Sequence, residues 1–295
     1  MKIVKVNNAN ISVPKGKAFA YETPPEMPKG HMVSIACGKR GAGKSVAITN
    51  LIKMLNYDRV LCISPTFKSN SILMKDLGID AEDVFEDADD PHVVDKIIKI
   101  IEDERDELET YLEQKKEYSK LLKMLNENYE NIPDEMLLMF YQNGTFIPPQ
   151  HKYGGRNPFI ALMIDDCQSS KLFTNKRIQN LTIKHRHIGA FNSDRPSIGI
   201  SLFFLVQNIK SKSGGLDRAI RNNSTNMLLF KNKDLAELDF IANEMAGEVD
   251  KMTFLNAYGY AMDDGEHPFL FIDLHKKDTH PSMFRSRFNK FLVNQ

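Results

Sequence analysis

The sequence predicts an α/β fold in which a mostly parallel central sheet is flanked by helices. Residues 31–37 and 59–64 are short apolar runs typical of buried strands, and the apolar run 46–55 between them fits a helix. A strand, a helix and a second strand at this spacing indicate a βαβ unit, in which the two strands are parallel. Two later apolar runs, 159–164 and 197–206, are continuous rather than alternating, as expected for strands buried on both faces.

A glycine-rich loop joins the first predicted strand to the first predicted helix. Its sequence, GKRGAGKS from Gly38 to Ser45, has the spacing of a phosphate-binding loop. The glycines let backbone N–H groups approach a phosphate closely, and the positive end of the following helix favours the anion. We expect Lys44 to reach the β- and γ-phosphates of ATP and the Ser45 hydroxyl to ligate Mg²⁺. The full predicted nucleotide-binding set is Gly38, Lys39, Arg40, Gly41, Ala42, Gly43, Lys44, Ser45 and Val46.

Acidic and amide side chains follow the two later predicted strands. Asp165 and Asp166 end the run 159–164, and Gln207 follows the run 197–206. In nucleoside triphosphatases that have a phosphate loop, an acidic residue at such a strand end holds magnesium through water, and an adjacent acid can polarise the attacking water. We therefore predict that Asp165 is the metal partner, that Asp166 is the base, and that Gln207 senses the γ-phosphate.

Composition excludes several classes of protein. Of the 295 residues, 42% are hydrophobic and 26% are charged, which is typical of a globular protein with a core. The cysteines Cys37, Cys62 and Cys167 fall in or next to predicted strands, so neither a disulfide framework nor a zinc site is predicted. No apolar run approaches the ~18 residues of a membrane span, and no signal peptide is evident. These features predict a cytoplasmic protein.

The charges are unevenly distributed along the chain. Formal net charge is zero, yet residues 76–135 carry 21 acidic side chains against 7 Lys or Arg. Residues 168–234 carry 12 Lys or Arg against 3 acidic side chains. The basic segment fits a surface for a polyanion, and an unevenly charged solvated surface is the alternative.

The pattern divides the chain into four parts. We expect a β-rich N-terminal cover over 1–30, an ATPase core over 31–90 and 150–275, an acidic helical insertion over 91–149, and a tail over 276–295. The insertion has helical periodicity to about residue 131 and either packs on the core or on itself as a hairpin, or provides a docking site. Residues 254–262 and 268–274 look like two strands of a hairpin, and the tail looks like a short helix.

The order of these motifs resembles that of the FtsK-HerA superfamily, and more narrowly of genome-packaging ATPases from large DNA viruses, the poxvirus type, and their smaller relatives. The resemblance covers roughly residues 30–275. It depends on GKRGAGKS, LMIDDCQ (162–168), KHRHIG (184–189), FFLVQN (203–208) and DRAIRNN (217–223). It departs from the wider fold at Asp166, where many members have glutamate.

The resemblance implies an additional-strand, RecA-like domain that assembles into a homo-oligomeric ring of five or six subunits. Such a ring hydrolyses ATP between subunits and pulls double-stranded DNA through its channel. An arginine of the neighbouring subunit completes each site, with Arg221 as the first choice here and Arg218 as the second. Capsid or portal-vertex proteins are further partners that the resemblance allows, in the host cytoplasm, at a virus assembly site or in the virion.

Two other functions remain open from the residues alone. One is a non-motor ATPase that acts in assembly, as in filamentous-phage morphogenesis. The other is a nucleoside or nucleotide kinase, which predicts an arginine-rich lid where this chain has an acidic insertion. Stimulation of ATP hydrolysis by long double-stranded DNA distinguishes the motor from both.

Overall fold

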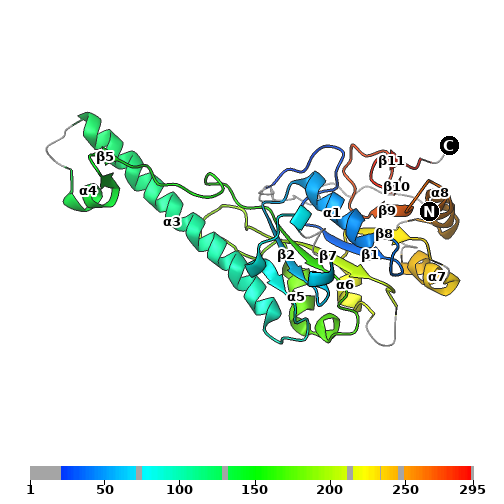
Figure 1. Ribbon diagram of the computed structural model, residues 1–295. Helices are drawn as coiled ribbons and strands as arrows, with labels where there is room; N and C mark the ends of the chain where they lie inside the picture. The colour runs from blue at the N-terminus through cyan, green and yellow to red at the C-terminus, as the bar shows by residue number, and fades with distance from the viewer. Residues whose placement is uncertain are drawn as a thin grey trace, which may run out of the picture.

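The computed structural model describes residues 21–70, 75–127, 132–210, 215–232, 234–244 and 249–293. Figure 1 shows a sheet flanked by helices, with one long helix that extends away from this body. Most of the predicted N-terminal cover, residues 1–20, lies outside the described residues. Within the described ranges, no helix combines the length and the apolar character needed to cross a membrane.

The main sheet has nine strands in the order β11-β10-β9-β8-β1-β7-β6-β2-β3. Six strands are parallel: β8 (Asn226–Phe230), β1 (Val33–Cys37), β7 (Ser201–Val206), β6 (Ile160–Ile164), β2 (Arg59–Ile63) and β3 (Val84–Phe85). Three antiparallel strands, β9 (Phe269–Asp273), β10 (Phe284–Ser286) and β11 (Lys290–Phe291), extend one edge. The predicted mostly parallel α/β fold is confirmed. Strand β7 lies between β1 and β6, which is the additional strand that the resemblance implies.

Both faces of the central sheet are buried. Every residue of β1, β6, β7 and β8 is buried, and successive side chains alternate between two apolar clusters. Helix α1 (Lys44–Leu55) covers one face with Ile48, Leu51 and Leu55. The other face is covered by the first half of α3 (Val93–Glu127) and by α5 (Lys176–Lys184), α6 (Arg218–Asn222), α7 (Leu235–Glu244) and α8 (Lys251–Met262). Short 3₁₀ helices span Phe67–Asn70, Ala81–Asp83 and Leu172–Thr174.

The chain between β3 and β6 forms an arm. Helix α3 has 35 residues, and its first half packs against the core through the buried side chains of Val94, Ile97, Ile101 and Leu108. The second half extends outward, and the far end carries α4 (Asp134–Phe140), β4 (Tyr141–Gln142) and β5 (Thr145–Phe146) (Figure 1). Of the alternatives left open by the sequence, the helix packs on the core over its first half, and α4 packs back against its far half, where the Tyr118 and Phe140 rings lie 5.2 Å apart. A docking role for the insertion stays a prediction.

Buried charges fix the root of this arm. Glu104 of α3 is buried and accepts hydrogen bonds from Arg59 Nη1 (2.7 Å) and Lys152 Nζ (2.8 Å). Arg59, at the start of β2, also binds the buried Asp83 through Nη2 (2.6 Å). The ion pairs therefore connect α3, the start of β2 and the segment before β3.

Residues 254–262 are helical, so the predicted hairpin with 268–274 is wrong. Asp250 caps α8, because its Oδ1 accepts hydrogen bonds from the backbone N–H groups of Met252 and Thr253 (both 3.0 Å). Phe254, Tyr258 and the next buried residue, Ala261, have helical spacing and pack on the core. The aromatic residues favoured a strand in the sequence, but β propensity depends on context, and here these residues pack on the core from one face of a capped helix.

The C-terminal tail forms strands rather than the predicted short helix. Phe284, Arg285 and Ser286 pair with β9 and are all buried. The Arg285 guanidinium donates to the Glu26 carbonyl oxygen (2.5 Å) and lies over the Phe291 ring at 4.3 Å. In the sequence, basic residues interleaved with phenylalanines had suggested a helix. The open edge of β9 provides the backbone partners that favour a strand instead.

Candidate nucleotide site

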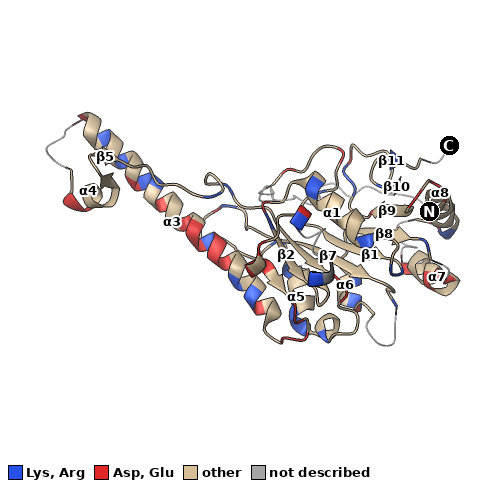
Figure 2. Cartoon of the chain, in the orientation of Figure 1, with Lys and Arg blue, Asp and Glu red and all other residues tan. Residues whose placement is uncertain are grey.

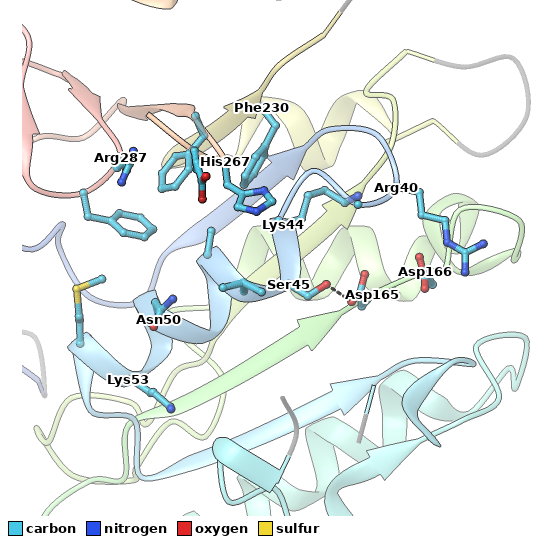
Figure 3. Close-up of a pocket in the computed structure, with 18 of the residues that line it drawn as sticks. Arg40, Lys44, Ser45, Asn50, Lys53, Asp165, Asp166, Phe230, His267 and Arg287 are labelled. Carbon is cyan, nitrogen blue, oxygen red and sulfur yellow. Dashed lines mark hydrogen bonds between the residues drawn. The ribbon is translucent and has the colours of Figure 1, made fainter. Parts of the chain in front are cut away.

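A cavity of about 990 Å³ lies at the edge of the sheet where the parallel strands end. Its first wall consists of the phosphate loop and α1, and the acids after β6 lie at one end (Figure 3). Its second wall consists of the end of β8, the loop before β9 and the turn between β10 and β11. The carboxyl ends of parallel strands meet at one edge, so residues distant in sequence converge there.

The phosphate loop turns directly from β1 into α1. Gly43 has φ of 96° and precedes the first residue of the helix, so a left-handed backbone allows the sharp turn. Gly38 lies so close to the end of β8 that a Cβ there would be 2.6 Å from Phe230 Cβ. Glycine is therefore required at Gly38 by close approach and favoured at Gly43 by conformation.

Lys44 is held by the loop itself. Its Nζ donates to the carbonyl oxygens of Gly38 (2.7 Å) and Lys39 (3.2 Å). Burial lowers the pKa of Lys44, and the nearby Asp165 and Asp166 oppose this shift. The ammonium group is thus positioned at the cavity, where a phosphate oxygen would be a stronger partner than a neutral carbonyl.

Ser45 and Asp165 meet across the cavity floor. Ser45 Oγ donates a hydrogen bond to Asp165 Oδ2 at 2.8 Å, although the two residues are 120 positions apart (Figure 3). Asp165 is 2% exposed, and burial raises its pKa, partly offset by the Ser45 hydrogen bond. A hydroxyl and a carboxylate are hard oxygen donors that fit Mg²⁺ when phosphate oxygens and water complete its coordination. Within the described ranges, no cluster of three or more His, Cys, Asp or Glu side chains offers a separate metal site.

Asp166 is exposed and is oriented by a residue that the sequence did not single out. Thr66 follows β2, and its hydroxyl donates to Asp166 Oδ2 at 2.8 Å. Asp166 also has a positive φ of 55°, an uncommon backbone conformation for aspartate. Because β2 and β6 are adjacent, the polar residues after β2 (Ser64 and Thr66) were the available signal for this contact.

Gln207 lies at the predicted strand end, but its side chain does not line the cavity. It follows β7, the strand between β1 and β6, and is exposed. Its backbone N–H donates to Gln168 Oε1 at 2.6 Å. The structure thus places the backbone of Gln207 between the phosphate loop and the acidic pair.

The two predicted arginines lie on α6, away from the residues that line the cavity of the same chain. Arg221 pairs with Glu244 (2.9 Å), donates to the Leu216 carbonyl oxygen (2.5 Å) and lies over the Phe240 ring. Arg218 is exposed at the start of the helix. A role at a neighbour's site would require Arg221 to leave Glu244, whereas Arg218 is already exposed.

Solved structures match this chain at low identity, whereas no family model and no curated protein matches it. The conjugation coupling protein TcpA of pCW3, in its monomer form with ATPγS, is 17% identical over 88% of this chain and 61% of that one, with a TM-score of 0.41. The genome packaging NTPase B204 from Sulfolobus turreted icosahedral virus 2, in complex with sulfate, is 12% identical over 89% of this chain and 98% of that one, with a TM-score of 0.46. The cytoplasmic domain of the Thermomonospora curvata type VII secretion ATPase EccC is 14% identical over 75% of this chain and 23% of that one, with a TM-score of 0.33.

These matched proteins are ATPases of the FtsK-HerA type, the superfamily that the sequence resembles. Their identities and TM-scores are too low to carry over an activity, a substrate or a partner. The assignment depends instead on the loop between β1 and α1 and on the acidic strand β6, separated from β1 by one strand. The chain has the fold of a P-loop NTPase.

The second wall of the cavity contains residues that the sequence analysis missed. They lie more than 180 positions after the phosphate loop and belong to no recognised motif: Phe230, Glu266, His267, Phe269, Arg287, Phe288 and Asn289. His267 lies beside the loop, since a Cβ on Gly43 would be 3.6 Å from its ring. Of the predicted nucleotide-binding set, the cavity is lined by Arg40, Gly41, Gly43, Lys44, Ser45 and Val46, and not by Gly38, Lys39 or Ala42.

Proposed function

We propose that this protein is a Mg²⁺-dependent ATP hydrolase. The observation that carries the proposal is the convergence of Lys44, Ser45 and Asp165 at the end of the parallel sheet, with the Ser45–Asp165 hydrogen bond of 2.8 Å. A phosphate chain laid along the loop would meet backbone N–H groups, the Lys44 ammonium and the positive end of α1. When bound, Mg²⁺ neutralises phosphate charge and fixes the phosphates against Ser45 and Asp165.

Asp166 has the position of a base in this proposal. It follows the metal-facing acid directly, is exposed, and is held by the Thr66 hydroxyl. A carboxylate oriented in this way can accept the proton of an attacking water. We expect Asp166→Asn to bind ATP and fail to cleave it, and Lys44→Ala to lose binding or turnover. Normal turnover by Asp166→Asn would remove that residue from the mechanism.

We further propose that hydrolysis drives double-stranded DNA through a homo-oligomeric ring that packages a viral genome. Exposed basic side chains on the contacting helices α5 and α6, among them Lys176, Lys184 and Arg218, support a DNA-facing surface there (Figure 2). Contacts of this kind neutralise phosphates, so binding should be independent of sequence and weaken steeply with salt.

The decisive measurement is the ATPase rate with and without long double-stranded DNA, together with the mass of the assembly in solution. Stimulation of several-fold in a ring-sized assembly supports the motor. A rate that is insensitive to DNA favours a non-motor assembly factor, and a requirement for a small phosphate acceptor favours a kinase.

DNA contact is tested separately on the basic surface. The double variant Lys176→Ala/Lys184→Ala should bind DNA more weakly and show a shallower dependence of affinity on salt, because two phosphate contacts are lost. Lys116→Ala, an exposed lysine on the arm, is the matched control. Equal effects of the two variants would exclude α5 as the DNA surface.

A shared site is tested by mixing inactive subunits. Rings that contain both Arg221→Ala and Lys44→Ala subunits should recover part of the activity, because some sites then combine an intact loop with an intact neighbouring arginine. Arg218→Ala is tested in the same way. Mixed rings without recovery would exclude a role for that arginine at a neighbour's site.

A further inference from the structure

The nucleotide cavity continues past the phosphate loop into an apolar recess. On its first wall, Val46 and Met54 of α1 are 49% and 38% exposed, whereas Ile48, Leu51 and Leu55 of the same helix are buried. Val46, Asn50 and Met54 follow one another at four-residue spacing, so they lie along one face of the helix, and all three line the cavity. The helix therefore presents a partly apolar face to the recess as well as one to the core.

Three phenylalanines form the opposite wall. The Phe269 ring lies 5.1 Å from the Phe230 ring and 5.0 Å from the Phe288 ring, measured between centroids. Phe230 and Phe269 are buried, whereas Phe288 is only half-buried. Phe288 is therefore the aromatic ring of this cluster with surface left to bind a ligand, and the other two support it.

Hydrogen bonds connect the two segments that form this wall, the loop before β9 and the turn between β10 and β11. Asp264, in the loop before β9, accepts hydrogen bonds from Ser286 Oγ (2.5 Å) and Lys290 Nζ (2.7 Å). The Arg287 side chain donates to the Asp264 carbonyl oxygen (2.6 Å), and its backbone N–H donates to the Phe269 carbonyl oxygen (3.0 Å). The turn between β10 and β11 is thus fixed before any ligand binds, which lowers the entropic cost of binding.

We infer that this recess binds the purine base of the nucleotide, and that the turn 287–289 is its base-binding wall. The inference rests on the proposed function in one respect: the phosphates of the same nucleotide lie at Lys44. A purine has a flat apolar face that stacks on an aromatic ring, and the Phe288 ring with the exposed α1 side chains provides such surfaces. Asn50 and Asn289 also line the cavity, and their amides can donate to and accept from the polar edge of a base.

The competing explanation is that the aromatic cluster only closes the apolar core beneath β8 and β9. In that case Phe288 would stabilise the fold and leave nucleotide affinity unchanged. The two explanations differ for a ligand that has phosphates and no base. Inorganic tripolyphosphate is that ligand, because it can occupy the phosphate loop and cannot reach the recess.

The test is calorimetric titration of the full chain with ATP and with tripolyphosphate, each in the presence of Mg²⁺. Phe288→Leu keeps an apolar side chain and loses the flat ring, so it should weaken ATP binding about tenfold and leave tripolyphosphate binding unchanged. Met54→Gln, on the partly exposed wall of α1, should act in the same direction without touching the phenylalanine cluster. Tyr260→Leu changes an aromatic residue that is 70% exposed on α8, outside the cavity lining, and should alter neither ligand.

The outcomes separate the two proposals. Equal weakening of both ligands by Phe288→Leu and Met54→Gln, or weakening of neither, overturns the base-binding wall. If Phe288→Leu fails to fold, Met54→Gln decides alone. Wild-type protein that binds neither ATP nor tripolyphosphate overturns the proposed ATPase itself. If the wild type binds tripolyphosphate as tightly as ATP, the base adds nothing to affinity; this refutes the base-binding wall and leaves the proposed ATPase standing.

Discussion

Acid should destabilise this protein through His31, the residue two positions before β1. The side chain is 3% exposed, and its Nδ1 has no hydrogen-bond partner among the described residues. Burial, together with His185 and Arg186 nearby, lowers the pKa of His31 from 6.5 to about 4. As pH falls below 6.5 the unfolded chain takes up a proton that the folded chain takes up only near pH 4. Lowering the pH therefore favours the unfolded state across this window.

The magnitude follows from the size of the pKa shift. A shift of that size reduces the free energy of unfolding by about 2 kcal/mol between pH 7 and pH 5, and by about 3 kcal/mol once the pH reaches 4. The assay is urea unfolding at pH 7 and pH 5 for the wild type and for His31→Asn, which cannot titrate and tolerates the positive φ of 51° at this position.

For each protein we compare the change in the free energy of unfolding between pH 7 and pH 5. A loss of stability that is equal at both pH values therefore cancels. His31→Asn should lose about 2 kcal/mol less than the wild type between pH 7 and pH 5. His187→Asn, which changes an exposed histidine two residues after His185, is the control. An identical pH dependence in the wild type and His31→Asn would refute the reasoning.

Three further changes test other parts of the structure. Asp165→Asn should raise the melting temperature of the nucleotide-free protein, because the raised pKa of Asp165 means that burying its ionised carboxyl costs stability. The same variant should lose Mg²⁺-dependent ATP binding, and thermal melts with and without Mg-ATP measure both effects. Arg59→Ala should lower the free energy of unfolding by about 3–5 kcal/mol, since it removes a partner of the buried Glu104. Urea unfolding of this variant, compared with that of Lys68→Ala, which changes an exposed lysine, checks the prediction. Gly199→Ala should cost at least about 1–3 kcal/mol, because φ is +68° and the added Cβ would lie 2.7 Å from the His31 ring; a melting temperature equal to that of the wild type would contradict it.

The sequence predicted the parts of the site that are formed by local sequence motifs. Glycine spacing, a lysine and a serine between a strand and a helix determine the phosphate loop locally, so Lys44 and Ser45 could be placed without tertiary information. The strand before Asp165 is a continuous apolar run, which can also be recognised from the sequence alone. Because both residues were predicted to hold the same Mg²⁺, Asp165 was expected to lie near Ser45, and the hydrogen bond between them is consistent with this.

The second wall of the cavity could not be predicted, because its residues become neighbours only through strand order. The loop before β9 and the turn after β10 reach the phosphate loop through pairing of β8, β9 and β10, and no local pattern encodes those partners. The error over residues 254–262 had the same origin. Phe254 and Tyr258 have high strand propensity, and their helical spacing matters only once the core that they cover is known.

Helix α3 makes the molecule sensitive to small movements at its root. Its 35 residues span about 52 Å at 1.5 Å per residue, and the outer half has few contacts with the body. A tilt of about 5° where Glu104 meets Arg59 would shift the free end of the helix, about 34 Å away, by about 3 Å. Spectroscopic labels at the end of this lever would therefore register a nucleotide-driven adjustment of the sheet too slight to detect at the sheet itself.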